Sequence, residues 1–269
     1  MVPPPPPRSQ AGSGESPGSS GATIKSADRV LAIFDLLAEK GTVRFVDVVN
    51  ALGLPRSSAH GLLATMTARN YLEFDEASRH YALGLRAWQL GQSYAGHGDL
   101  EARARPLMDE LAKTSGETVQ LARLDGIFNV YVAIAESPQP MQLVSHVGSR
   151  LHAHATGVGK VLLAALDPAE ARRRLAAQPL PRLTERTVTD VDTLMDVLAQ
   201  VRASGYAQDH EEYVAGCHCV AVPVRDRQGG TLAALSLSTP TFRCDEQRAA
   251  EQLQLLRALV DRLERLLGR

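Results

Sequence analysis

"GLPRSSAHGLLATM" (residues 53–66) decides the fold of the first part of this chain. Gly53 marks a tight turn, and Pro55 suits the first turn of a helix because it has no amide proton to leave unpaired. Leu62 and Leu63 follow where a buried helical face needs apolar side chains. The exposed start of the predicted helix carries basic and hydrogen-bonding side chains: Arg56, Ser57, Ser58 and His60.

The sequence on both sides of this helix predicts a winged helix-turn-helix over residues 22–84. Upstream, residues 23–41 have the apolar spacing of an amphipathic helix with Ser26 as its expected N-cap, and residues 44–54 predict a second helix. Downstream, residues 70–84 predict two short strands around a polar turn. Three helices and a hairpin, with a glycine-containing turn before the third helix, indicate this fold.

The start of the predicted third helix is chemically suited to read DNA. A helix fits the major groove, its N-terminal residues approach base edges, and its positive end favours phosphate. We therefore predict contacts to double-stranded DNA from this start and from nearby basic residues: Arg44, Arg56, Ser57, Ser58, His60, Arg69 and Arg79. Two alternatives remain open. The winged helix could bind a protein instead of DNA, and Arg79 could be a solvated turn residue that contacts nothing.

The charge of this region is modest. Residues 41–69 carry a net charge of +2, whereas residues 22–84 hold seven basic and seven acidic side chains. A neutral domain with a small positive patch binds DNA weakly alone, so we expect a homodimer, which doubles the phosphate contacts. The net charge of the whole chain, −1 over 269 residues, excludes a uniformly basic nucleic-acid binder.

Composition indicates the cellular compartment in which the protein works. Residues 1–21 are rich in Pro, Gly and Ser and predict a disordered tail, without the apolar core of a secretory signal. Three cysteines are too few for a disulfide framework and indicate a reducing compartment. No apolar run reaches 18 residues, so we expect no membrane partner and a cytoplasmic protein.

The second part of the chain predicts an α+β domain. Residues 85–98 predict a helical linker that ends in a glycine-containing joint around Gly96, and residues 99–269 form the domain. Strand patterns flank the Asp125-Gly126 and Gly229-Gly230 turns, and helical patterns lie between and after them. We expect an antiparallel sheet with helices on one side, which is typical of a small-molecule sensor rather than a Rossmann fold.

One glycine-rich segment, ATGVGKV (residues 155–161), invites comparison with a phosphate-binding loop. That loop requires a glycine where His154 stands and Ser or Thr where Val161 stands, so we exclude ATP binding. What remains is a turn that leads into a helix, whose free amides would suit a carboxylate. The alternative is a tight turn that needs glycine for conformational reasons.

The segment DHEEYVAGCHCVAVP (residues 209–223) holds the densest polar cluster. Together with His152 and His154 it leaves open a zinc-sensing site, and a Cys-His pair leaves open an enzyme acting on a small metabolite. Neither alternative has a second paired motif or a demonstrated base, so we expect no metal, no cofactor and no catalysis.

The same segment also predicts a strand with a mildly polar face. Cys217 and Cys219 share one side of the strand, and Ser236 and Ser238 share one side of its predicted neighbour. Two thiols and two hydroxyls would form a small polar pocket. Small residues that fill a core beneath a helix are the alternative.

Four stretches together resemble the IclR family of bacterial transcriptional regulators, over nearly all of the chain after the tail. They are KSADRVLAIFDLLAEKG, GLPRSSAHGLLATMTARNYLEFDEASRHYALGLRAWQLG, LHAHATGVGKVLLAAL and GYAQDHEEYVAGCHCVAVPVRDRQGGTLAALSLSTP. The last is the most specific, because Glu211-Glu212, Gly216, Cys219 and the two serines keep the family's order and spacing.

The resemblance implies an N-terminal winged helix-turn-helix and a C-terminal GAF-like effector domain. It implies homodimers, often paired into tetramers, on palindromic operators, and a regulator, expected to be a repressor, of a catabolic or metabolic operon. The implied effectors are small organic acids or aromatic metabolites. Motif matching places the effector pocket at Gly157, Val158, Asp209, Cys217, Cys219, Ser236 and Ser238.

Two positions depart from the family pattern. Gly61 stands in the recognition helix where the family usually carries arginine, which removes a phosphate or base contact and costs about 1 kcal/mol of helix stability. Cys217 stands where many relatives have a larger side chain, which widens the expected pocket.

Overall fold

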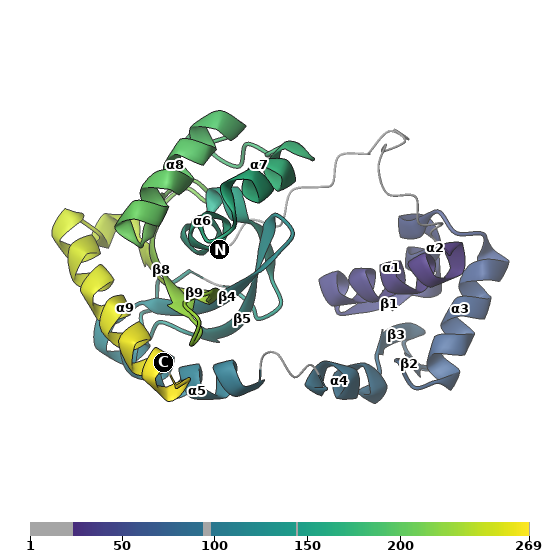
Figure 1. Ribbon diagram of the computed structural model, residues 1–269. Helices are drawn as coiled ribbons and strands as arrows, with labels where there is room; N and C mark the ends of the chain where they lie inside the picture. Colours follow the sequence, from purple (N-terminus) through teal and green to yellow (C-terminus); the bar gives the residue numbers. More distant parts are fainter. Residues whose placement is uncertain (1–23, 94–97, 144, 269) are drawn as a thin grey trace. The chain divides into compact units, whose positions relative to one another are not determined.

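The structure, a computed structural model, describes residues 24–93, 98–143 and 145–268 (Figure 1). They form two compact units that divide between residues 93 and 98. The predicted tail and the joint at Gly96 lie outside the described residues. Within the described part of the chain, no helix is long and apolar enough to cross a membrane.

The first unit is a winged helix-turn-helix, as predicted. Its core packs apolar side chains from all three helices and the hairpin, including Ile33, Val48, Leu63 and Leu72. The strands form an antiparallel sheet in the order β1-β3-β2. The elements are α1 (Lys25–Lys40), β1 (Thr42–Arg44), α2 (Phe45–Leu52), α3 (Arg56–Ala68), β2 (Leu72–Asp75), β3 (His80–Leu83) and α4 (Leu85–Gln92).

Two local expectations for this unit were wrong. Helix α1 begins at Lys25 with Ile24 in the cap position, so Ser26 lies inside the helix and caps nothing. Strand β1 was not predicted, because three residues are too short to show an alternating pattern. It pairs with β3 and extends the hairpin into a three-stranded sheet.

The second unit is an α+β domain around one antiparallel sheet of six strands, in the order β6-β5-β4-β9-β8-β7. Its strands are β4 (Thr118–Asp125), β5 (Phe128–Ala135), β6 (Arg150–His152), β7 (Ala207–His210), β8 (Cys217–Arg225) and β9 (Thr231–Pro240). Its helices are α5 (Gly98–Ser115), α6 (Gly157–Ala164), α7 (Pro168–Ala176), α8 (Val191–Ser204) and α9 (Glu246–Leu266), with short 3-10 turns at Ala153–Ala155 and Thr241–Arg243.

Helices cover both faces of this sheet, not one face as we expected (Figure 1). Helices α5 and α9 pack on one face, against side chains such as Val222 and Leu235. Helices α6, α7 and α8 form the layer on the other face, against Ala221 and Ala234. The central strands are buried on both sides, which explains why their apolar runs are nearly continuous.

Candidate functional site

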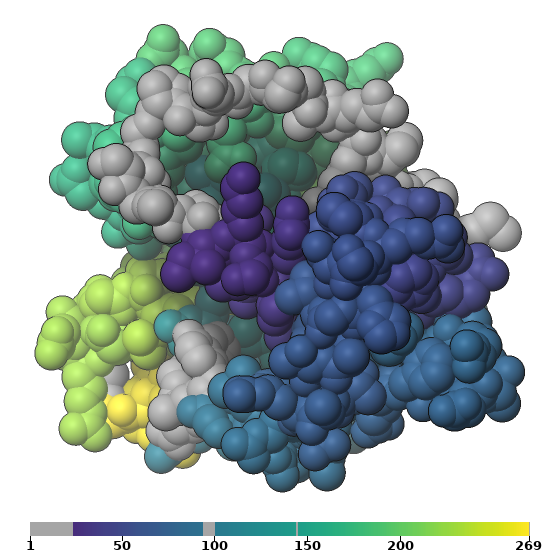
Figure 2. Space-filling model, turned by 90° about the vertical axis from the view of Figure 1, so that its right-hand side faces the viewer, coloured from purple at the N-terminus to yellow at the C-terminus, as the bar shows by residue number. Residues whose placement is uncertain are grey.

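Helix α3 offers the exposed surface expected of a recognition helix. It begins directly after Pro55, and Gly53 provides the left-handed turn that separates it from α2. No side chain caps its N-terminus, so its first backbone amides are open to an anion. Arg56, Ser57 and His60 are exposed at this end, and Ser58 is half-buried. In Figure 2 the first unit, purple to blue, is viewed from the side on which α3 lies.

Beyond its first turns, α3 presents only small side chains to solvent. The exposed positions here are Gly61, Ala64, Thr65 and Ala68. The Thr65 hydroxyl donates to the Gly61 carbonyl oxygen at 2.8 Å. A Cβ at position 61 would meet nothing within 4 Å, so the site is open to a side chain such as arginine. Long side chains that can reach a groove are therefore concentrated at the start of the helix.

The candidate basic residues fall into two classes. Arg44 is paired with Asp47 (Nε to Oδ2, 3.2 Å), and hydrogen bonds from Arg44 lower the pKa of that carboxyl. Arg79 lies 3.9 Å from Glu76 and over the ring of Phe74. Among the described residues, Arg56 and Arg69 have no ion-pair partner, so they are the most available for phosphate.

In the second unit, register brings four of the predicted effector residues into two adjacent rows, while Cys217 lies further along β8, opposite Pro240. The first row runs across four strands, with Asp209 opposite Cys219, Cys219 opposite Ser238 and Ser238 opposite Thr118. The second row places Ser236 between Ala221 and Gln120. The polar members of both rows are buried. We call these rows the polar face of the sheet.

Hydrogen bonds join the polar face into one network. Both serine hydroxyls donate to Oε1 of Gln120, at 3.1 Å from Ser236 and 2.9 Å from Ser238. The Cys219 Sγ lies 3.1 Å from the Ser238 Oγ and 3.6 Å from the Cys217 Sγ. The hydrogen bond to Cys217 and burial raise the pKa of the Cys219 thiol. A thiol in this environment is not an activated nucleophile, which argues against cysteine catalysis.

The start of α6 lies directly on the polar face. Thr156 caps the helix by accepting a hydrogen bond from the Gly159 amide at 3.0 Å. A Cβ at Gly157 would lie 3.3 Å from that of Ala221, so the helix start touches β8. Within the described chain, the amides of Gly157 and Val158 have no hydrogen-bond acceptor. These two amides point the positive end of the helix at a buried polar surface.

A buried ion pair lies beside these rows. Lys160 of α6 bonds Oε1 of Glu212, and their side chains are only 4% and 11% exposed. The Glu212 amide donates to Oδ1 of Asp209 at 2.7 Å. Burial raises the pKa of Asp209 to about 7. Burial also raises the pKa of Tyr131, with Cys219 as the next cause, so this tyrosine reaches the same region from β5.

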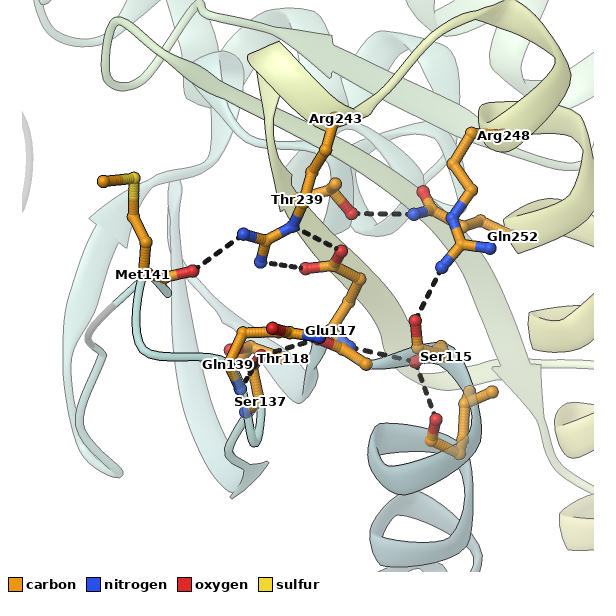
Figure 3. Close-up of polar contacts among 12 residues, drawn as sticks. Ser115, Glu117, Thr118, Ser137, Gln139, Met141, Thr239, Arg243, Arg248 and Gln252 are labelled. Atoms are coloured by element: carbon orange, nitrogen blue, oxygen red, sulfur yellow. Dashed lines mark hydrogen bonds and ion pairs between the residues drawn. The ribbon is translucent and has the colours of Figure 1, made fainter.

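The polar face is joined at one end to helix α5 (Figure 3). Glu117 stands between Thr118 of the first row and the last residue of α5. Its carboxylate forms two hydrogen bonds of 2.8 Å with Arg243, which raise the pKa of the arginine. Arg248 of α9 donates to the Ser115 carbonyl oxygen at 2.6 Å. The end of α5 is therefore anchored to the region that follows β9.

Other groups that the sequence singled out do not join this site as metal ligands. Among the residues that the structure describes, no group of three or more His, Cys, Asp or Glu side chains is arranged to hold a metal ion. The rings of His152 and His154 meet edge to face, with their centroids 5.6 Å apart. His218 bonds Cys244 at 3.1 Å. The proposed zinc ligands are thus divided among separate contacts.

A groove of about 400 Å³ lies elsewhere, between β8 and α9. It contains none of the predicted effector residues, and its lining includes Gly205, Arg225, Arg257 and Asp261. The start of α6 instead covers the polar face.

Four residues at the polar face were not assigned to the effector site from the sequence: Thr118, Gln120, Lys160 and Glu212. The signal for the first two was present, because the period-two pattern of residues 118–125 places them on one face of a strand. The pairing of Lys160 with Glu212 spans 52 residues and has no local signature.

A winged helix-turn-helix and a second domain with a buried polar face define a DNA-binding transcriptional regulator with an effector-binding domain. Family models agree with this class. The "IclR helix-turn-helix domain" matches residues 26–76, and "Bacterial transcriptional regulator IclR C-terminal" matches residues 92–265. The chain belongs to the IclR family of transcriptional regulators, as the sequence indicated. Since this is a family of regulators and not of enzymes, the enzymatic alternative is set aside.

Individual relatives span nearly the whole chain. The HTH-type transcriptional regulator XynR of Escherichia coli is 37% identical over 235 residues, 86% of this chain and 93% of XynR. The HTH-type transcriptional repressor AllR of the same organism is 32% identical over 97% of this chain and 96% of its own length. An IclR homolog from Microbacterium hydrocarbonoxydans, solved with 4-hydroxybenzoate, is 27% identical with a TM-score of 0.78, over 90% and 98% of the two chains.

Proposed function

We propose that this protein represses a catabolic or metabolic operon and releases its operator when a small organic acid binds the polar face of the second unit. The observation that carries this proposal is the pair of open amides at Gly157 and Val158, which meet a buried polar surface. A relative, AllR, is named a repressor, and a structural relative is titled as a complex with an aromatic acid.

The two units have different roles, DNA binding and effector binding. Residues 22–84 are the DNA-binding domain, residues 85–98 the linker that transmits the signal, and residues 99–269 the effector domain. The first turns of α3 contact the operator through Arg56, Ser57, Ser58 and His60, with phosphate contacts from Arg69. Arg44 and Arg79 contact phosphate after they release their acidic partners, Asp47 and Glu76. A protein that acts on chromosomal DNA works in the cytoplasm.

The active form is a homodimer, with a dimer of dimers as its higher assembly. One winged domain has no net charge and binds DNA weakly, so two copies are needed for a palindromic operator. Helix α4 buries none of its residues in its own unit. Its Leu85 and Trp88 are more than 60% exposed, lie about one helical turn apart and form an apolar surface for a second copy.

The effector is held between α6 and the sheet. Its carboxylate accepts hydrogen bonds from the amides of Gly157 and Val158, and the rest of the molecule contacts the sheet. The sheet side consists of the predicted residues Asp209, Cys217, Cys219, Ser236 and Ser238, to which we add Thr118 and Gln120 because they are buried and lie opposite the two serines. A ligand controls DNA affinity only if it binds two arrangements of the dimer differently.

Substitution of Arg56 tests the DNA half of this proposal. Arg56→Ala removes one contact from each half-site, worth about 1–3 kcal/mol each, so dimer binding weakens by about 30-fold or more. Electrophoretic mobility shift or fluorescence anisotropy on the DNA upstream of the gene, at physiological salt, measures this loss. Gly61→Arg adds a cation at an open position and tightens binding.

Arg172→Ala is the matched control, because Arg172 is an exposed arginine of α7 that pairs with Asp192 in the second unit. It leaves DNA affinity unchanged. Equal DNA affinity for wild type and Arg56→Ala would show that α3 does not read the operator.

A further inference from the structure

We propose that Gln120 determines which effector is accepted, and that the group it selects is a hydroxyl on the chain of a carboxylic acid. This inference rests on the proposed function, because it assumes that the polar face is the effector site. It assigns a role to a residue outside the motif-matched set, and it names the chemical class of the ligand more narrowly than the family resemblance does.

Only one of the two polar atoms of the Gln120 carboxamide has hydrogen-bond partners. The residue is completely buried, and its Oε1 accepts both serine hydroxyls. Its Nε2 has no hydrogen-bond partner. A buried donor without a partner costs about 1–3 kcal/mol, and orphaned N–H groups are rarer in proteins than orphaned carbonyl oxygens. The two free hydrogens of this amide therefore point to an acceptor that arrives with a ligand.

The two serine hydroxyls on the sheet side act as acceptors toward a ligand. Because the Ser236 and Ser238 hydrogens are directed at Gln120, both hydroxyls present only lone pairs to a ligand. The Ser238 oxygen also contacts the thiol of Cys219, which leaves Ser236 with the more open lone pairs. Asp209 adds a carboxyl group in the neighbouring row. The sheet thus offers one carboxamide donor among several acceptors.

A hydroxyl group matches this arrangement because it accepts and donates at once. It accepts from Nε2 of Gln120 and donates to Oγ of Ser236 or to Asp209. A ketone or ether oxygen only accepts, and a methylene group does neither. A second carboxylate is unsuitable at Ser236 and Ser238, since the hydrogens of both hydroxyls are already directed at Gln120.

The donors for the effector carboxylate lie on the opposite side, at the start of α6. The Gly157 and Val158 amides have no acceptor of their own among the described residues. Nδ2 of Asn129 is a further buried donor without a partner, and the Oδ1 of the same residue accepts the hydroxyl of the helix cap Thr156 at 2.6 Å. The geometry points to a hydroxy acid, with its carboxylate at α6 and its hydroxyl at Gln120.

The test compares acids that differ by a single hydroxyl or set of hydroxyls. Isothermal titration of the full-length protein uses the pairs glycolate and acetate, lactate and propionate, 3-hydroxybutyrate and butyrate, gluconate and hexanoate, and 4-hydroxybenzoate and benzoate. At least one hydroxy acid binds about tenfold more tightly than its deoxy partner, the ratio expected for one additional well-placed hydrogen bond. In Gln120→Leu this ratio falls to about twofold or less, while the affinity for the deoxy acid is retained.

Two further variants make the result decisive. Ser236→Ala removes the acceptor with a minimal change of volume and also lowers the ratio, which keeps the test valid if Gln120→Leu does not fold. Gln252→Leu is the matched control, because Gln252 is a fully buried glutamine on the opposite face of the sheet (Figure 3), where its Nε2 donates to Thr239 at 2.7 Å. It leaves the ratio unchanged.

The outcomes separate this inference from the function on which it rests. Equal binding of all hydroxy and deoxy partners, an unchanged ratio in both Gln120→Leu and Ser236→Ala, or no binding of any of these acids overturns the role of Gln120. Acids that bind with the expected preference but leave operator retention unchanged overturn the proposed control of DNA binding and leave the specificity inference intact.

Discussion

The two faces of the six-stranded sheet are built from the same strands and have opposite chemistry. Towards α5 and α9, strands β8 and β9 present apolar side chains such as Val222, Leu235 and Leu237. Towards α6, the intervening residues of the same strands include Cys219 and Ser236. Because side chains alternate along a strand, one pair of strands serves both stability and recognition.

The faces also differ in how completely their polar groups are satisfied. Buried atoms without partners on the α6 side include Nε2 of Gln120 and Oε2 of Glu212. The α9 side also has such an atom, Oε1 of Gln252, but most of this side is an apolar cluster that extends from α5 through the sheet to α9. This difference suggests that the apolar face supplies the stability that allows the opposite face to keep unsatisfied groups for a ligand.

The largest effect is expected on the polar face, from loss of one partner of the buried ion pair. Lys160→Met leaves Glu212 buried and unpaired, and lowers the free energy of unfolding by about 3–5 kcal/mol. Urea unfolding of the full chain, followed by circular dichroism, measures the change. The double variant Lys160→Met/Glu212→Gln recovers most of the loss, because no uncompensated charge remains.

Fluorescence of Trp88 provides an internal control for this experiment. It is the only tryptophan of the chain and lies in helix α4 of the first unit, so unfolding that is limited to the second unit leaves its transition in place. A single variant as stable as the wild type, or a double variant less stable than the single one, would contradict the structural role of the pair.

The next effect compares adjacent residues of β9 that face opposite sides. Leu235→Ala creates a cavity on the apolar face and costs about 3 kcal/mol. Ser236→Ala removes one hydrogen bond on the polar face and costs about 1 kcal/mol. Urea unfolding of the two variants under the same conditions gives the ratio. Equal losses would mean that the two faces contribute alike, and that the division between stability and recognition is incorrect.

Local patterns predicted much of this architecture. The spacing of apolar residues around 53–66, with its turn and exposed first residues, was sufficient for the winged helix-turn-helix, because these contacts lie close together in sequence. The Gly229-Gly230 turn likewise fixed the pairing of β8 with β9, and with it the shared face of Cys219 and Ser238. A pattern that two neighbouring strands and one turn can specify is readable from sequence.

What sequence analysis missed depends on longer-range contacts. Strand β7, Ala207–His210, is short and polar at an edge, so it lacked an apolar alternation, yet it brings Asp209 opposite Cys219. Gln120 joins Ser236 only because β4 pairs with β9 across 116 residues. We did not predict that helices cover both faces of the sheet. An apolar run shows that a strand is buried, but it does not show which helices cover the strand.

The most gradual effect is a pH dependence that arises on the polar face. Burial raises the pKa of Asp209 from 3.8 to about 7, so between about pH 4 and 7 the folded carboxyl keeps a proton that the unfolded chain has lost. The free energy of unfolding therefore falls as the pH rises through this window, by at most about 1.4 kcal/mol per pH unit. Asp209→Asn stays neutral and removes this contribution.

Urea unfolding at several pH values between 4 and 7 compares the slopes of wild type and Asp209→Asn. His218, whose pKa burial lowers to about 4, gives the opposite slope, because its charged form is disfavoured in the folded protein. It is present in both proteins, so their difference isolates Asp209. The wild type loses stability relative to the variant as the pH rises. Parallel curves would show that Asp209 ionises as freely in the folded protein as in the unfolded chain, and that this part of the polar face is solvated.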